Sequence, residues 1–161
     1  MKILIITNSY PPEIRSTSHL MYEMATEMRS LGHAVTVLTS FPGYNLAEGV
    51  DREAIPEVRE EEGVTVLRAR TLPLKKVGYV RRGVAELGLP FNFIRLLKQN
   101  AGAFDAIWVF SPPLTLALLA AWLKKRYTAT LLMNAQDIFP QNGIDLGIIR
   151  NPAVIFAYER M

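Results

Sequence analysis

Residues 2–39 read KILIITNSYPPEIRSTSHLMYEMATEMRSLGHAVTVLT, and the hydrophobic pattern of this stretch decides the fold. Residues 2–7 and 34–39 are short apolar runs rich in β-branched side chains, which is typical of strands buried on both faces of a parallel sheet. Between them, apolar residues recur at helical spacing from Leu20 to Leu31, and Gly32 follows as a natural helix stop. A strand, a helix and a strand in this order predict a βαβ unit.

The alternation of strands and helices continues along the chain. Further strands are predicted at 64–69, 106–110 and 128–134. Further helices are predicted at 80–97, at 114–122 and from Pro152 onward. The cations at 124–126 suit the carboxyl-terminal end of the helix that includes 114–122. Pro90 is expected to kink or divide the helix at 80–97, and we predict two helical pieces. Residues 40–63 lose the periodicity and are predicted to form a long surface excursion, and 137–147 are rich in turn residues. The pattern predicts a doubly wound α/β domain.

Composition excludes several classes of site. The chain has 161 residues, half of them apolar and a fifth charged, which suits one compact domain with a substantial core. It contains no cysteine and only two histidines, which argues against a zinc site, an iron–sulfur cluster and a cysteine nucleophile, and suits a reducing compartment. No apolar run approaches the roughly 18 residues that span a bilayer, and no export signal is visible. We therefore expect a cytoplasmic protein.

Common catalytic motifs are missing from the loops where ligands should bind. The first glycine is Gly32, so the first loop carries no dinucleotide-binding glycine motif, and no glycine pair at Walker spacing is followed by lysine. The serine-hydrolase elbow and the H-E-x-x-H zinc motif are also absent. In doubly wound sheets, ligands bind beyond the carboxyl ends of the strands, which directs attention to residues 8–18, 111–115 and 134–142.

The first of these loops ends in Arg15, Ser16 and Thr17 at the predicted helix start. Unpaired backbone N–H groups and the helix dipole favour an anion at such a position, and Arg15 would add a fork of donors for phosphate or carboxylate. The alternative is that Ser16, Thr17 or Ser18 is only a helix cap and that Arg15 is a solvated loop residue. Residue types alone leave both interpretations open.

Three stretches resemble the family 4 glycosyltransferases. They are MKILIITNSYPPEIRSTSHLMYEMATEMRSLGHAVTVLT at 1–39, FDAIWVFSPPLTLALLAAWLKKR at 104–126 and NAQDIFPQNGIDLGIIRNPAVIFAYER at 134–160. The last two resemble the subgroup that builds bacterial surface polysaccharides and their lipid-linked precursors. The resemblance implies one Rossmann-like lobe of a two-domain GT-B architecture, with the acceptor held mainly by the N-terminal lobe and the nucleotide-sugar by the C-terminal lobe.

The resemblance further implies a hexosyl-type transfer that retains the anomeric configuration, from a nucleotide-sugar to a hydroxyl of a glycan or lipid-linked acceptor, with no cofactor and no required metal. Residues 1–161 would be the N-terminal, acceptor-side domain, and the donor-binding domain with its paired glutamates would be absent from this chain. We therefore expect that this chain alone turns over no sugar nucleotide. The alternative from another class is a non-catalytic Rossmann-like module that binds an anionic ligand or a protein partner.

Two positions depart from the family pattern. Arg15-Ser16 stands where the family usually has two glycines close to the donor diphosphate, so Arg15, Ser16 and Thr17 are the donor-binding candidates. Gln136-Asp137 stands where many relatives have His-Asp, and these two residues are the catalytic candidates. Unlike a histidine, however, a glutamine neither takes up nor releases a proton at neutral pH. Asp137 could equally be a helix cap. His19 and Ser111 are the acceptor-binding candidates, and for His19 a surface or packing role is the alternative.

Charge is distributed unevenly along the chain. Residues 51–67 hold six acids and two bases, a net charge of −4, and residues 68–98 hold eight bases and one acid, a net charge of +7. We predict an anionic membrane surface as the partner of Lys75, Lys76, Arg81 and Arg82, supported by the neighbouring residues Tyr79, Phe91, Phe93, Arg95 and Lys98. The alternative is an ordinary helix with its charged side in water. No nucleic-acid recognition fold accompanies these cations.

Overall fold

The computed structural model describes residues 1–43, 45–72, 78–100, 102–111, 113–136, 141–147 and 149–160. Their strands form one sheet in the order β3-β4-β2-β1-β5-β6. The strands are β1 (Lys2–Ile6), β2 (Ala34–Ser40), β3 (Val58–Glu61), β4 (Val64–Ala69), β5 (Ala106–Ser111) and β6 (Thr130–Ala135). All neighbours pair in parallel except β3, which is antiparallel to β4. The predicted doubly wound α/β fold is confirmed.

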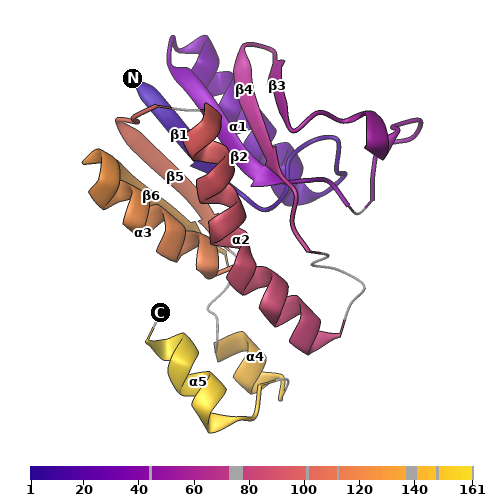
Figure 1. Ribbon diagram of the computed structural model, residues 1–161, viewed down its shortest axis with the longest axis vertical. Helices are drawn as coiled ribbons and strands as arrows, with labels where there is room; N and C mark the ends of the chain where they lie inside the picture. The colour runs from indigo at the N-terminus through magenta and orange to yellow at the C-terminus, as the bar shows by residue number, and fades with distance from the viewer. Residues whose placement is uncertain are drawn as a thin grey trace.

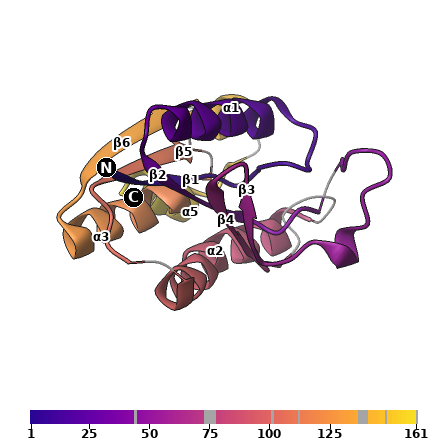
Figure 2. The ribbon, with the colours of Figure 1, turned by 90° about the horizontal axis from the view of Figure 1, so that it is seen from above.

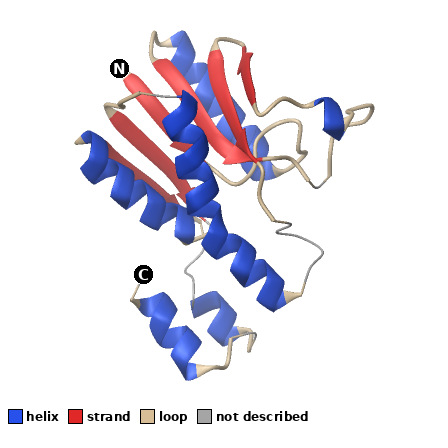
Figure 3. Cartoon of the chain, in the orientation of Figure 1, coloured by secondary structure: helices blue, strands red, loops and turns tan. Residues whose placement is uncertain are grey.

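Helices cover both faces of the sheet. Helix α1 (Ser16–Ser30) lies on one face, and α2 (Tyr79–Asn100) and α3 (Thr115–Tyr127) lie on the other (Figure 2). A short 3₁₀ helix, η1 (Arg52–Ala54), follows β2. The helices α4 (Gln141–Asp145) and α5 (Pro152–Glu159) lie beyond the carboxyl ends of the strands (Figures 1 and 3). Within the predicted turn-rich stretch 137–147, the described residues 141–145 form the short helix α4.

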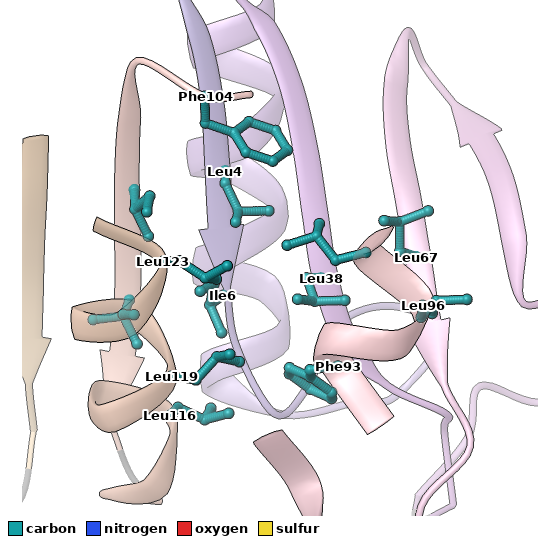
Figure 4. Packing of buried hydrophobic residues seen from close by; sticks show 14 of the residues in the cluster. Leu4, Ile6, Leu38, Leu67, Phe93, Leu96, Phe104, Leu116, Leu119 and Leu123 are labelled. Atoms are coloured by element: carbon teal, nitrogen blue, oxygen red, sulfur yellow. The ribbon is translucent and has the colours of Figure 1, made fainter. Parts of the chain in front are cut away.

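Alternate residues of the strands build two hydrophobic cores. In β1, Ile3 and Ile5 pack in the layer under α1, whereas Leu4 and Ile6 pack in the layer under α2 and α3. Figure 4 shows the second layer, where Leu4 and Ile6 meet side chains from both helices. These four β1 residues are 6% exposed or less. Burial on both faces is the reason for the continuous apolar run at the start of the chain.

The structure corrects the prediction for residues 40–63. This stretch contains β3, whose residues are mostly exposed and carry no apolar alternation. Two contacts from α1 hold the β3–β4 turn: Tyr22 Oη donates to Glu62 Oε2 (2.7 Å), and Arg29 Nε donates to the carbonyl of Gly63 (3.0 Å). Backbone pairing and contacts with distant residues define this strand, so hydrophobic periodicity gave no signal for it.

Helix α2 also differs from the prediction, because it is one helix that continues through Pro90 and bends (Figure 1). Its apolar positions lie on two faces. The buried face consists of Ala85, Leu89, Phe93, Leu96 and Leu97. Val84, Leu87 and Phe91 also recur at helical spacing, but their side chains are exposed. No described helix has both the length and the apolarity needed to cross a membrane.

The predicted helix ends are confirmed for α1 and α3. Gly32 follows α1 with φ +84°, a left-handed conformation that glycine adopts without the steric cost of a Cβ. The last turn of α3 contains Lys124, Lys125 and Arg126, whose charges complement the negative end of the helix dipole.

Candidate functional site

The chain reverses direction across the sheet at β1. It passes from β1 to β2 on one side, and later returns to β5 on the other side of β1. Such a switch point leaves a crevice beyond the carboxyl ends of the two strands. Residues 7–15 follow β1 at this edge, and Ser111 and Gln136 mark the ends of β5 and β6. The predicted ligand loops therefore share one edge of the sheet.

The loop after β1 is held by a buried carboxylate. Ser9 Oγ donates to Glu13 Oε2 (2.6 Å), and the backbone N–H of Gly43 donates to Glu13 Oε1 (2.9 Å). Glu13 is only 9% exposed. Thr7 Oγ1 adds a bond to the carbonyl of Ser9 (3.1 Å). Glu13 therefore fixes the loop after β1 to the loop after β2, which makes it a positioning residue in this arrangement.

Further bonds join the same two loops. The N–H of Ile14 donates to the carbonyl of Asn45 (2.8 Å), and Asn45 Nδ2 donates back to the carbonyl of Ile14 (2.8 Å). The N–H of Ala47 donates to the carbonyl of Pro12 (3.0 Å). Backbone groups bonded in this way limit the freedom of the residues that lead into α1.

A buried arginine holds the loop from the opposite direction. Arg68, on β4, is 1% exposed, and its Nη2 donates to the carbonyl of Pro11 (2.8 Å) and to both carboxylate oxygens of Glu61 (2.9 and 3.0 Å). Its Nε and Nη1 are buried without a hydrogen-bond partner among the described residues. Burial raises the pKa of the neighbouring Tyr10 hydroxyl above its ordinary value, and the Glu61 carboxylate raises it further.

Sequence reasoning counted Arg68 among the cations of the basic stretch and missed this role. The structure pairs Arg68 with Glu61 and Arg70 with Glu57, so part of that positive charge is balanced by the preceding acidic stretch. One signal was present in the sequence. Arg68 alternates with Val64 and Val66, which both belong to the core under α1.

The start of α1 corrects the helix-cap interpretation. The helix begins at Ser16, and Arg15 occupies the cap position with an extended backbone (φ −151°, ψ 153°). No side chain of the described residues makes a capping hydrogen bond there. Ser18 Oγ is buried and has no hydrogen-bond partner among the described residues. Ser16 is exposed, while Arg15 and Thr17 are half-buried. In the part of the chain that the structure describes, the N–H groups of the first turn thus have no side-chain acceptor, and anion binding there stays a prediction.

The ends of β5 and β6 place two more candidates together. The N–H of Gln136 donates to the carbonyl of Ser111 (3.0 Å), which extends the ladder between the two strands by one bond. Ser111 is buried, whereas Gln136 is exposed and donates through Nε2 to Asn134 Oδ1. Asp137 lies outside the described residues. At the start of α3, Thr115 Oγ1 is buried without a partner in the described part of the chain.

The remaining candidate near this edge, His19, lies on the surface of α1. Its Nε2 is 3.1 Å from Glu23 Oε1, one turn further along the helix, and both side chains are well exposed. An exposed pair of this kind contributes little to stability. The arrangement agrees with a surface histidine, and the acceptor role of His19 stays a prediction.

A groove of about 590 Å³ lies between α1 and the strands β5 and β6. Its lining consists of Leu20, Met21, Glu23, Met24, Thr26, Glu27, Trp108 and Asn134. Trp108 faces Leu132 across the ladder, and Leu132 is 44% exposed. The buried Nε1 of Trp108 has no acceptor among the described residues. Sequence reasoning missed this groove, because strand patterns do not show which part of a sheet face a helix covers.

A family model described as a glycosyl transferase 4-like domain matches residues 18–160 of the chain. The chain belongs to the glycosyl transferase 4-like family. A search of curated proteins gave no match. The family match confirms the predicted resemblance at the level of the family, and the six-stranded α/β sheet agrees with one Rossmann-like lobe of the GT-B architecture. Glycosyl transfer requires a sugar donor and an acceptor.

The basic residues that we predicted as a membrane surface of this glycosyl transferase 4-like domain are described only in part. Lys75 and Lys76 lie outside the described residues, as does the side chain of Arg82. Arg81 is exposed on α2. The prediction that Phe93 supports a membrane surface is wrong, because its side chain is fully buried against the sheet. Phe91, two residues earlier, is exposed.

Proposed function

We propose that this glycosyl transferase 4-like domain is the acceptor-side lobe of a retaining glycosyltransferase. The enzyme would move a hexosyl-type sugar from a nucleotide-sugar to a hydroxyl of a glycan or lipid-linked acceptor, at the cytoplasmic face of a membrane. A second domain would grip most of the donor. The bacterial surface-polysaccharide subgroup, which the sequence resembles, is the setting that we favour.

The observation that carries the proposal is the start of α1 at the carboxyl ends of the strands, where the chain reverses its direction across the sheet at β1. Arg15 stands at this helix start, no side chain among the described residues caps the helix, and the loop before it is fixed by Glu13 and Arg68. The positive end of the helix dipole and an arginine fork suit the two negative charges of a nucleotide-sugar diphosphate. Because these groups are held in place before the reaction, they would stabilise charge that develops on the leaving diphosphate.

The other candidates suit the acceptor. Gln136 is exposed at the same edge, and its amide can donate to and accept from a sugar hydroxyl. It cannot take up the proton of that hydroxyl at neutral pH, so its role would be orientation of the acceptor. Ser111 and His19 stay acceptor candidates, and Asp137 stays a catalytic candidate. The proposed transfer uses no metal and no cofactor.

The test uses the enzyme that contains this lobe and a panel of nucleotide-sugars, with release of nucleoside diphosphate as the assay. Arg15→Ala should raise the KM for the donor about tenfold or more, because a charge-assisted bidentate contact is lost, and Arg15→Lys should restore part of it. Arg59→Ala, at an exposed arginine on β3, is the matched control and should leave the KM unchanged. An unchanged donor KM in Arg15→Ala would remove Arg15 from the donor site.

The division into two lobes has its own test. The chain of 161 residues, given donor and acceptor, should release no nucleoside diphosphate above the uncatalysed rate. Steady release by this chain alone would show that it holds a complete active site, and the acceptor-lobe proposal would then be wrong.

A further inference from the structure

Helix α2 carries an exposed apolar strip on the side that faces away from the core. Val84, Leu87 and Phe91 are 56%, 53% and 75% exposed, and we name these three residues the α2 ridge. Their spacing of three and four residues places them on one face of the helix. Phe91 is the most exposed large apolar side chain in the described part of the chain. An amphipathic helix that only packs on a sheet would present polar residues on this side.

Cations extend the same face at both ends of the α2 ridge. Arg81 lies three residues before Val84, and Arg95 and Lys98 lie four and seven residues after Phe91. These spacings return to the same side of a helix, and all three cations are exposed. The single acid of α2, Glu86, is half-buried and lies at a helical position on the opposite side. The outward face therefore combines apolar side chains with positive charge and contains no acid.

The opposite face of α2 already has its partners. Leu89, Phe93, Leu96 and Leu97 are fully or almost fully buried in the core that includes β2, β4 and α3. The amino-terminal half of α2 extends past the carboxyl ends of the strands (Figure 1). The α2 ridge thus lies on an outer side of the molecule, toward the end where the candidate site is located.

We propose that the α2 ridge binds the surface of an anionic lipid bilayer. Leu87 and Phe91 would enter the boundary between headgroups and acyl chains, and Arg81, Arg95 and Lys98 would lie at the level of the lipid phosphates. Three apolar side chains in a single row are a small area compared with the roughly 800 Å² per partner of a stable protein interface. Lysine is also depleted at the centre of such interfaces. The proposal stands on exposure and charge, and does not depend on the transfer reaction.

The experiment is co-sedimentation of the chain with vesicles of phosphatidylcholine alone and of phosphatidylcholine mixed with phosphatidylglycerol. The chain should bind the mixed vesicles and lose this binding as salt is added, because the attraction of cations to the surface is screened. Phe91→Ala should lower the partition coefficient about tenfold, as expected for the loss of a buried aromatic side chain. Its matched control is Leu31→Ala, which removes a 66% exposed leucine at the end of α1 and should bind like the parent chain.

The cations are tested in the same assay. The double variant Arg95→Gln and Lys98→Gln should lower binding to the mixed vesicles at least tenfold, whereas Lys124→Gln with Lys125→Gln, two exposed cations at the end of α3, should change it much less. Circular dichroism confirms that each variant is folded. Equal binding by Phe91→Ala and Leu31→Ala, or binding that ignores phosphatidylglycerol, would overturn the proposal. So would sedimentation showing that the parent chain self-associates and that Phe91→Ala abolishes this, because the α2 ridge would then be a contact between copies.

Discussion

Two ion pairs at the β3–β4 edge have nearly the same distance and differ in how far their side chains are buried, and this allows a matched test of burial. Arg68 Nη2 lies 2.9 Å from Glu61 Oε1 with side chains that are 1% and 24% exposed. Arg70 Nε lies 2.8 Å from Glu57 Oε1 with side chains that are 64% and 45% exposed. We predict that Glu61→Ala destabilises the fold strongly and that Glu57→Ala hardly does.

The magnitude follows from the partners that remain. Without Glu61, the buried guanidinium of Arg68 keeps one acceptor, the carbonyl of Pro11, while its Nε and Nη1 have none among the described residues. Removing one partner of a buried pair costs about 3–5 kcal/mol, and the partial exposure of Glu61 favours the lower end, about 3 kcal/mol. An exposed pair contributes about 0–1 kcal/mol. At this chain length, 1 kcal/mol corresponds to roughly 2–4 °C in Tm, so Glu61→Ala should lower the Tm by about 6–12 °C.

The assay is thermal and urea unfolding followed by circular dichroism, with Arg68→Met combined with Glu61→Ala as a third variant. The double variant should be more stable than Glu61→Ala alone, because the methionine removes the charge that was left buried. Equal losses of stability in Glu61→Ala and Glu57→Ala would refute the reasoning. A double variant less stable than the single one would show that Arg68 contributes through its other contacts.

Three more outcomes are expected from unfolding measurements. Phe93→Ala should lower the free energy of unfolding by about 3–5 kcal/mol, because it empties a fully buried position. Phe91→Ala, at a 75% exposed position, should lower it by less than about 1 kcal/mol. Similar losses in the two variants would contradict the arrangement of α2 with one buried and one exposed apolar face. Burial raises the pKa of Tyr10, so its contribution to stability is complete below the ordinary tyrosine pKa of about 10 and is lost as the pH rises above it, by up to about 1.4 kcal/mol per pH unit. In urea unfolding at alkaline pH, the free energy of unfolding of Tyr10→Phe should therefore fall less steeply with pH than that of the parent chain. Parallel declines in the two proteins would refute this. Gly88→Ala should stabilise the chain by up to about 1 kcal/mol, because Gly88 lies in the interior of α2 and an added Cβ meets nothing within 4 Å. Gly63→Ala should destabilise the chain, since Gly63 has φ +76° and the new Cβ would lie 2.8 Å from Arg29 Nε. A higher Tm for Gly63→Ala than for Gly88→Ala would contradict the backbone geometry.

Much of the fold could be predicted because its signals are local. The apolar run of β1 and the helical spacing of α1 each depend on neighbours in the sequence, and their order identifies a βαβ unit. Strand β3 gave no such signal, since its charged residues pair with β4 and bonds from α1 hold the turn that joins the two strands. A strand that is defined by distant partners cannot be recognised from its own residues.

The candidate site also has a part that the sequence could predict and a part that only the folded chain shows. The rule that ligands bind at the carboxyl ends of parallel strands pointed to the loops that contain Arg15, Ser111 and Gln136, and the resemblance to the family drew attention to Arg15 and Gln136 within them. The two groups that fix the first loop, Glu13 and Arg68, could not be selected from the sequence. Their partners Gly43 and Pro11 lie 30 and 57 residues away, and only the folded chain brings them within hydrogen-bond distance.

The sequence by itself determined the alternation of strands and helices, the doubly wound architecture and the glycosyl transferase 4-like family, because hydrophobic periodicity and short motifs are properties of neighbouring residues. The tertiary structure alone decided which apolar face of α2 is buried. Leu89 with Phe93 and Leu87 with Phe91 both satisfy helical spacing, and the choice between them depends on the position of the sheet. The tertiary structure also decided that Arg68 is a buried residue that holds the loop after β1, and not a surface cation, because burial depends on which strands become neighbours.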